Sequence, residues 1–118
     1  MKKLTTVLVA VLLTLTSFGQ LNENAKLLKA YAVDDYEQIK TASVREWGEN
    51  HEMVLYMINN QSDAFLEVAD ILTEGNYDSE LLTSAFKEYG ETIEGIFYIN
   101  YVMTLYTYRE QMKAKSQY

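Results

Sequence analysis

The run over residues 93–112 constrains the fold more than any other part of the chain, because most of its side chains are apolar or aromatic. At the helical period of 3.6 residues, Ile96, Ile99 and Met103 fall on one line, with aromatic side chains on both sides of it. The remaining polar line is narrow and consists of Asn100, Thr104, Thr107 and Gln111. A helix with so wide an apolar arc has to be covered on most of its sides. We therefore expect this run to form the central helix of a small bundle.

A β-strand is the alternative for the same run. Phe97, Ile99 and Tyr101 also alternate with the opposite face, and tyrosine, isoleucine and valine favour sheets. The run is too long for one ordinary strand, however, and no partner strand is evident in the rest of the sequence. Residues 109–115 are helix formers with basic side chains, which suit a helix C-terminus. The helix is the preferred prediction.

Capping residues and glycines divide the rest of the chain into further amphipathic segments. Helices are expected to begin after Asn22, Asp34, Asn50 and Asp78, and the final one after Thr92. The third helix extends to about Glu74, because the apolar side chains between residues 54 and 72 keep one helical phase. The first two segments could form one bent helix. The sequence thus predicts an all-α fold, a small up-and-down bundle of four or five helices in one domain over residues 20–118.

The first 19 residues have the pattern of a secretory signal peptide. Lys2 and Lys3 precede an apolar stretch over residues 4–15, and small residues end the segment before Gln20. The apolar stretch is shorter than the ~20 residues that a membrane-spanning helix prefers, so we expect cleavage rather than anchoring. The prediction is a bacterial protein that is periplasmic or secreted and that meets the membrane only during export.

Charge and cysteine content exclude several classes of function. The formal net charge is −7, and no Lys or Arg occurs between Arg45 and Lys87. Nucleic acids and anionic membrane surfaces need a basic footprint, so neither is an expected partner. The chain has no Cys, which rules out disulfides, covalent c-type haem and lipid attachment to a cysteine.

His51 is the only histidine and therefore limits the metal chemistry of the chain. A zinc-binding helix motif that begins at His51 needs a second histidine at position 55, which is Leu55. A ferritin-like site needs two histidines as well. Non-covalent haem held by His51 and a methionine stays open as an alternative. We expect His51 to be a surface residue at a helix start.

An acidic stripe is the second metal candidate. Its members are spaced by four, three and four residues, which places them on one helical face: Asp63, Glu67, Asp70 and Glu74. Ca²⁺ binds carboxylate oxygens, but a straight helix does not wrap its side chains around an ion. We prefer a solvated helix face, and no cofactor is predicted.

No set of residues in the sequence points to catalysis. Pairs such as Glu91 with Glu94, or Glu49 with Glu52, have the side chains for acid–base hydrolysis, but nothing marks them as buried. A nucleophile elbow is also missing from the sequence. An enzyme of unrecognised type is therefore the least favoured alternative.

The tyrosines suggest a recognition surface. The sequence contains ten, and tyrosine suits interfaces because one end is apolar and the other forms hydrogen bonds. A small bundle has few elements to cover four of them in the final helix, namely Tyr98, Tyr101, Tyr106 and Tyr108. We expect these four to form a docking surface for a protein partner or a homodimer seam. The predicted function is an interaction or self-associating module, with a ligand, haem or metal-ion carrier as the alternative.

Overall fold

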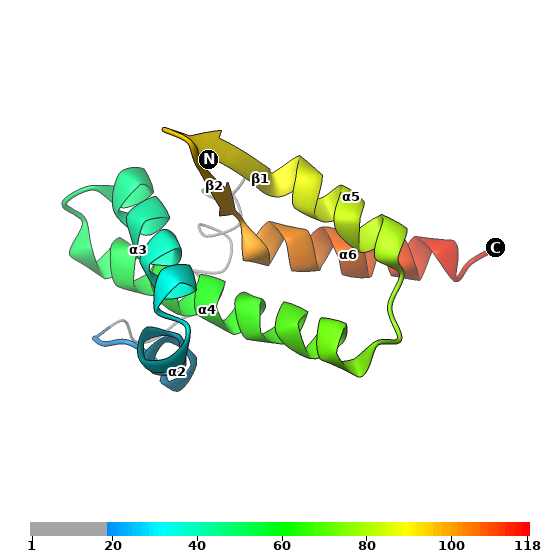
Figure 1. Ribbon diagram of the computed structural model, residues 1–118, viewed down its shortest axis with the longest axis horizontal. Helices are drawn as coiled ribbons and strands as arrows, with labels where there is room; N and C mark the ends of the chain where they lie inside the picture. The colour runs from blue at the N-terminus through cyan, green and yellow to red at the C-terminus, as the bar shows by residue number, and fades with distance from the viewer. Residues whose placement is uncertain (1–18) are drawn as a thin grey trace. The chain divides into compact units, whose positions relative to one another are not determined.

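The fold is all-α, with one short β-hairpin. The computed structural model describes residues 19–118, and five helices make up most of them (Figure 1). The elements are α2 (Glu23–Tyr31), α3 (Val33–Trp47), α4 (His51–Glu74), α5 (Ser79–Tyr89), β1 (Gly90–Ile93), β2 (Ile96–Ile99) and α6 (Tyr101–Lys115). The prediction of a small all-α bundle with four or five helices is confirmed. The predicted signal peptide lies outside the described residues, except for Gly19.

The chain consists of two compact units, and helix α4 contributes residues to both. The N-terminal unit is Met1–Asp63 and the C-terminal unit is Ala64–Tyr118. The expectation of one domain over residues 20–118 stays a prediction. Within residues 19–118, none of the helices combines the length and the apolar character needed to cross a lipid bilayer.

Asn22 begins α2 and also ties it to α4 within the N-terminal unit. Its Oδ1 accepts a hydrogen bond from the Ala25 N–H at 2.8 Å, which is the capping role expected from the sequence. The Asn22 N–H donates to Asn59 Oδ1 at 2.8 Å. The side-chain amides of Asn22 and Asn24 donate to Asp63 Oδ1 at 3.0 and 2.9 Å. The polar side chains of Asn59 and Asp63, in the middle of α4, thus bind the start of α2.

Helices α2 and α3 are separate, which settles the question that the sequence leaves open. Ala32 breaks the helix with φ −135° and ψ 58°. Helix α3 ends at Gly48, where φ is +56°. Helix α4 is continuous over 24 residues, so the prediction of one long helix to Glu74 is confirmed.

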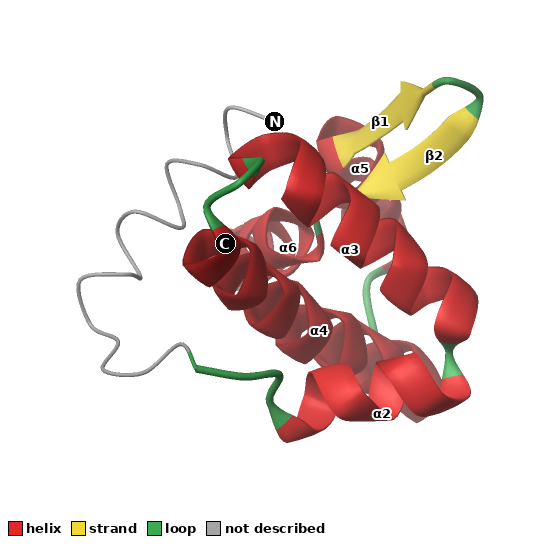
Figure 2. Ribbon diagram, turned by 90° about the vertical axis from the view of Figure 1, so that its left-hand side faces the viewer, coloured by secondary structure: helices red, strands yellow, loops and turns green. Residues whose placement is uncertain are grey.

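The prediction of a helix over residues 93–112 is right from Tyr101 onward and wrong before it. Residues 90–99 form an antiparallel hairpin, in which Gly90 pairs with Ile99 and Ile93 with Ile96 (Figure 2). The two turn residues, Glu94 and Gly95, have φ +52° and +80°. Positive φ at both positions is the type I′ geometry, which matches the twist of the strands. The strand that pairs with residues 96–99 is therefore the segment immediately before the turn.

Helix α6 begins at Asn100, not at Thr92. The Asn100 side chain accepts a hydrogen bond from the Met103 N–H at 3.1 Å, and its backbone N–H donates to the Tyr89 carbonyl at 3.0 Å. This residue therefore closes the hairpin and caps the helix at the same time.

Helices α5 and α6 lie side by side in the C-terminal unit (Figure 1). Their shared core contains Leu82, Ala85 and Tyr108. Asp78 caps α5 as predicted, since its Oδ1 accepts the Leu81 N–H at 3.1 Å. Lys115 Nζ contacts the other oxygen of Asp78 at 2.6 Å, and these bonds hold the end of α6 to the start of α5.

Candidate apolar binding site

The four tyrosines of the predicted docking surface do not share an exposed face. Tyr98, Tyr101 and Tyr108 are buried, with 5, 9 and 6% of their surface exposed, and only Tyr106 is open at 58%. The hairpin places Tyr98 outside the helix, and Tyr101 packs edge to face against Phe65, with ring centroids 5.0 Å apart. Three of the four rings are therefore covered in this structure, although a small bundle was expected to leave them exposed.

The acidic stripe is divided among different interactions. Asp63 accepts the two asparagine amides at the start of α2. Glu67 forms an exposed ion pair with Arg109 of α6, with 2.6 Å between oxygen and nitrogen. Asp70 and Glu74 are exposed. The four carboxylates follow the axis of α4 and do not converge on one point.

His51 is the first residue of α4 and is exposed. This is the position expected for a histidine at a helix start. Within residues 19–118, no group of three or more histidine, aspartate or glutamate side chains is placed to hold a metal ion. The structure therefore brings neither His51 nor the acidic stripe together with further ligands.

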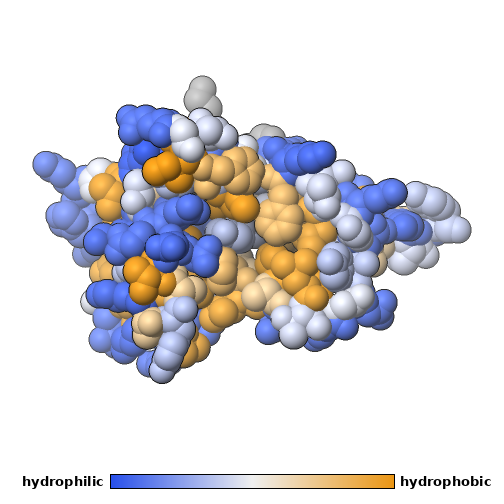
Figure 3. Space-filling model, viewed as in Figure 1, coloured by the Kyte–Doolittle hydropathy of each residue, from blue (hydrophilic) through white to orange (hydrophobic). Residues whose placement is uncertain are grey.

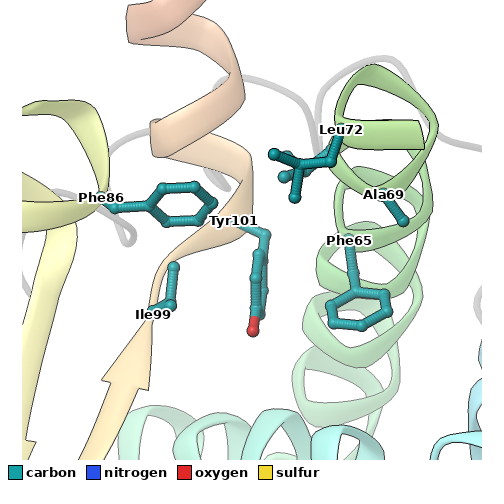
Figure 4. Close-up of a pocket in the computed structure, with 7 residues that line it drawn as sticks. Phe65, Ala69, Leu72, Phe86, Ile99 and Tyr101 are labelled. Atoms are coloured by element: carbon teal, nitrogen blue, oxygen red, sulfur yellow. The ribbon is translucent and has the colours of Figure 1, made fainter. Parts of the chain in front are cut away.

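An apolar pocket in the C-terminal unit is the strongest candidate site. Its volume is about 210 Å³. One wall is the face of α4 that carries Phe65, Val68, Ala69 and Leu72, at the helical spacing of three, four and seven residues from the first. Phe86 from α5, Ile99 from the end of β2 and Tyr101 from the start of α6 form the other walls (Figure 4).

The hairpin and the cap of α6 shape this pocket. The turn at Glu94 and Gly95 returns the chain to α5, so that Ile99 pairs with Gly90 next to the end of that helix. Asn100 then starts α6, and Tyr101 points back toward Phe65 (Figure 4). Ala69 contributes only a methyl group to the lining.

Apolar surface continues beyond the pocket. Leu72 lines it and is still 45% exposed. Phe97 is 49% exposed and lies on the same face of the hairpin as Ile99, since side chains two residues apart in a strand share a face. The Phe97 ring lies directly over Gly90. Figure 3 shows apolar side chains gathered on the surface between α4 and α5.

The chemistry of the lining favours binding over catalysis. Six of the seven lining side chains are hydrocarbon, and the phenol of Tyr101 is the only polar group among them. Burial of apolar surface is non-directional and contributes ~25 cal/mol per Å². A site of this kind can hold an apolar group, with the Tyr101 hydroxyl as the one lining group able to form a hydrogen bond to it.

The sequence predicts the apolar helix face that forms one wall of the pocket, but it does not predict the pocket. The helical phase between residues 54 and 72 already contains Phe65, Ala69 and Leu72. Phe86 comes from the predicted helix α5, whereas the position of Ile99 depends on the hairpin, which occupies the start of the run predicted to be helical. The chain matches no model of a known protein family, no curated protein and no solved structure.

Proposed function

We propose that this protein is an exported binding module that receives an apolar side chain of a partner protein in the pocket of its C-terminal unit. The observation that carries the proposal is an open pocket lined almost entirely by hydrocarbon side chains, with Leu72 of its lining half exposed and Phe97 half exposed on the strand face that it shares with Ile99. Exposed apolar surface next to a concave site is typical of interaction surfaces. The signal-peptide pattern of the first 19 residues supports export.

The size of the pocket suits a single apolar side chain of the partner, which we call the anchor. A dry cavity of ~150 Å³ accepts a benzene molecule, whereas pockets for drug-sized ligands start at about 300 Å³. A volume of about 210 Å³ therefore fits one aromatic ring or one branched aliphatic side chain. Interfaces commonly concentrate their binding energy in such buried anchors, with weaker contacts around them.

Peptide titration followed by NMR tests the proposal. The probe is an amphipathic peptide of about 15 residues, long enough to form a helix, with one phenylalanine anchor and uncharged flanks. We expect the chemical-shift changes to cluster on the pocket-lining residues. Leu72→Ala should weaken binding about fivefold, because it removes apolar contact area. Leu27→Ala is the matched control, since Leu27 is 48% exposed on α2 and lies outside the pocket.

A second variant tests the cavity itself. Ala69→Leu fills part of the pocket and should abolish binding, whereas Ala114→Leu makes the same change at an exposed position of α6. Melting temperatures verify that each variant folds. If millimolar peptide produces no shifts, or if the shifts lie elsewhere, the pocket is not the interaction site.

Carriage of a small apolar molecule is the second candidate function, favoured by the hydrocarbon lining. If indole or toluene binds in the pocket and no peptide does, the result supports the carrier and rejects the interaction module.

Sedimentation of the protein alone tests self-association. A dimer that dissociates on Leu72→Ala would make a second copy the partner.

A further inference from the structure

The surroundings of the pocket are acidic. Residues 64–118 contain nine carboxylates and four Lys or Arg side chains. Two of those four cations, Arg109 and Lys115, are already paired with carboxylates at 2.6 Å. Both pairs lie within the C-terminal unit itself. The net negative charge of the unit is therefore not balanced locally.

Carboxylates also lie close to the pocket-lining positions of α4 and α5. Asp70 and Glu74 are exposed and each lies two residues from Leu72, while Glu88 lies two residues after Phe86. Residues two positions apart in a helix have their Cα atoms about 5.4 Å from each other, and their side chains leave the axis about 200° apart, so these carboxylates do not line the pocket and lie on the neighbouring surface. Charges on that surface act on the flanks of a bound segment and not on its apolar anchor, and their effect falls off over the Debye length of ~8 Å at physiological ionic strength. Lys87 is the one cation next to a lining residue of these two helices, so the balance remains negative.

We infer that the segment that enters the pocket is cationic: an amphipathic peptide whose apolar anchor is flanked by lysine or arginine. This inference rests on the proposed function and adds the charge of the partner to it. Opposite charge around an apolar anchor accelerates association and excludes acidic competitors, which would be repelled. The net charge of −7 over the whole chain acts in the same direction.

Three peptides with one anchor and different flanks test the inference on the purified protein. They carry the same phenylalanine, with lysine, glutamine or glutamate at the flanking positions. At low salt we expect the lysine peptide to bind about tenfold more tightly than the glutamate peptide, with the glutamine peptide between them. The difference should shrink severalfold in ~1 M NaCl, where the Debye length is about 3 Å.

Charge variants separate the local carboxylates from the total charge. Asp70→Asn with Glu74→Gln should reduce the preference for the lysine peptide by about threefold. The control pair is Asp34→Asn with Glu37→Gln, which removes the same charge from exposed positions of α3. A smaller effect in the control supports a role for the carboxylates near Leu72. An equal effect would assign the preference to net charge alone and reject that role.

The outcomes distinguish this inference from the proposed function. If all three peptides shift the pocket residues with equal affinity at low salt, the proposed function stands and the cationic partner is rejected. If the glutamate peptide binds best, the sign of the inference is wrong. If none of the peptides binds, the proposed function itself fails.

Discussion

Replacing Gly90 with alanine tests how the hairpin packs against α5. Gly90 has φ −93° and ψ 148°, which any residue can adopt, so the backbone conformation does not require glycine. The space does. A Cβ at this position would overlap the Phe97 ring, with Cε1 at 2.6 Å, and would lie 2.8 Å from the carbonyl oxygen of Phe86. Both contacts are shorter than a real Cβ tolerates, so the Phe97 ring and the Phe86 carbonyl both have to shift relative to residue 90.

The expected cost follows from what each neighbour loses. Phe97 is 49% exposed, so displacing its ring forfeits about half of the 1.5–3 kcal/mol that full burial contributes, or about 1 kcal/mol. The carbonyl of Phe86 belongs to the backbone and cannot rotate away, and overpacking of this kind adds about 1–2 kcal/mol. Alanine recovers about 0.5 kcal/mol because it loses less backbone entropy on folding than glycine. Gly90→Ala should therefore reduce the free energy of unfolding by about 2 kcal/mol.

Thermal denaturation followed by circular dichroism measures this effect. For a domain of 60–100 residues, 1 kcal/mol corresponds to a shift of about 4–8 °C, so the melting temperature should fall by about 8–16 °C. The matched background is Phe97→Ala, which removes the ring but leaves the Phe86 carbonyl in place. In that background Gly90→Ala should cost about 1 kcal/mol less, which is the coupling expected of two groups in contact.

Two results would refute this reasoning. If Gly90→Ala leaves the protein as stable as the parent, the close approach of the Phe97 ring does not exist in solution. If the cost is the same with and without the ring, the strain comes from the backbone of α5 and not from the hairpin face.

Two further predictions concern the turn and the α5 cap. Glu94 has φ +52°, which asparagine tolerates better, so Glu94→Asn should raise the free energy of unfolding by about 0.5–1 kcal/mol in urea denaturation; a loss of stability would contradict the type I′ turn. Hydrogen bonds from Lys115 and the Leu81 N–H hold the pKa of Asp78 below its ordinary value of 3.8. Because folding lowers this pKa, the stabilisation is complete above 3.8 and is lost as the pH falls through the folded-state pKa. Asp78→Asn should therefore lower the melting temperature at about pH 6, the difference from the parent should shrink as the pH falls below 3.8, and a constant difference would show that the charge is unimportant.

Local capping chemistry made most of the helices predictable. Asn22 and Asp78 accept the backbone N–H bonds that their positions suggest, and both helices begin where expected. The long helix α4 could be recognised because its apolar phase continues through a polar patch. The reason for that patch could not be read from the sequence, since Asn59 and Asp63 bind residues about 40 positions away.

The hairpin was missed because its signal is short. Tyrosine, isoleucine and phenylalanine at residues 96–99 fit a helical arc and a strand equally well. The deciding feature is the pair Glu94 and Gly95 between Ile93 and Ile96, a two-residue connection with glycine in the second position. Glutamate is not a usual residue for the first position of a type I′ turn, so the pattern was not recognised.

The pocket exists because the helix does not continue through this segment. In a helix, Ile99 and Tyr101 would lie about 200° apart around the axis and could not line one cavity. The observed chain ends a strand at Ile99, turns at Asn100 and starts a helix at Tyr101, so both side chains face the same space. Asn100 is 4% exposed and occupies its cap position through two backbone contacts. The residue that appears in the sequence as part of a polar helix line is therefore the one that sets the geometry of the binding site.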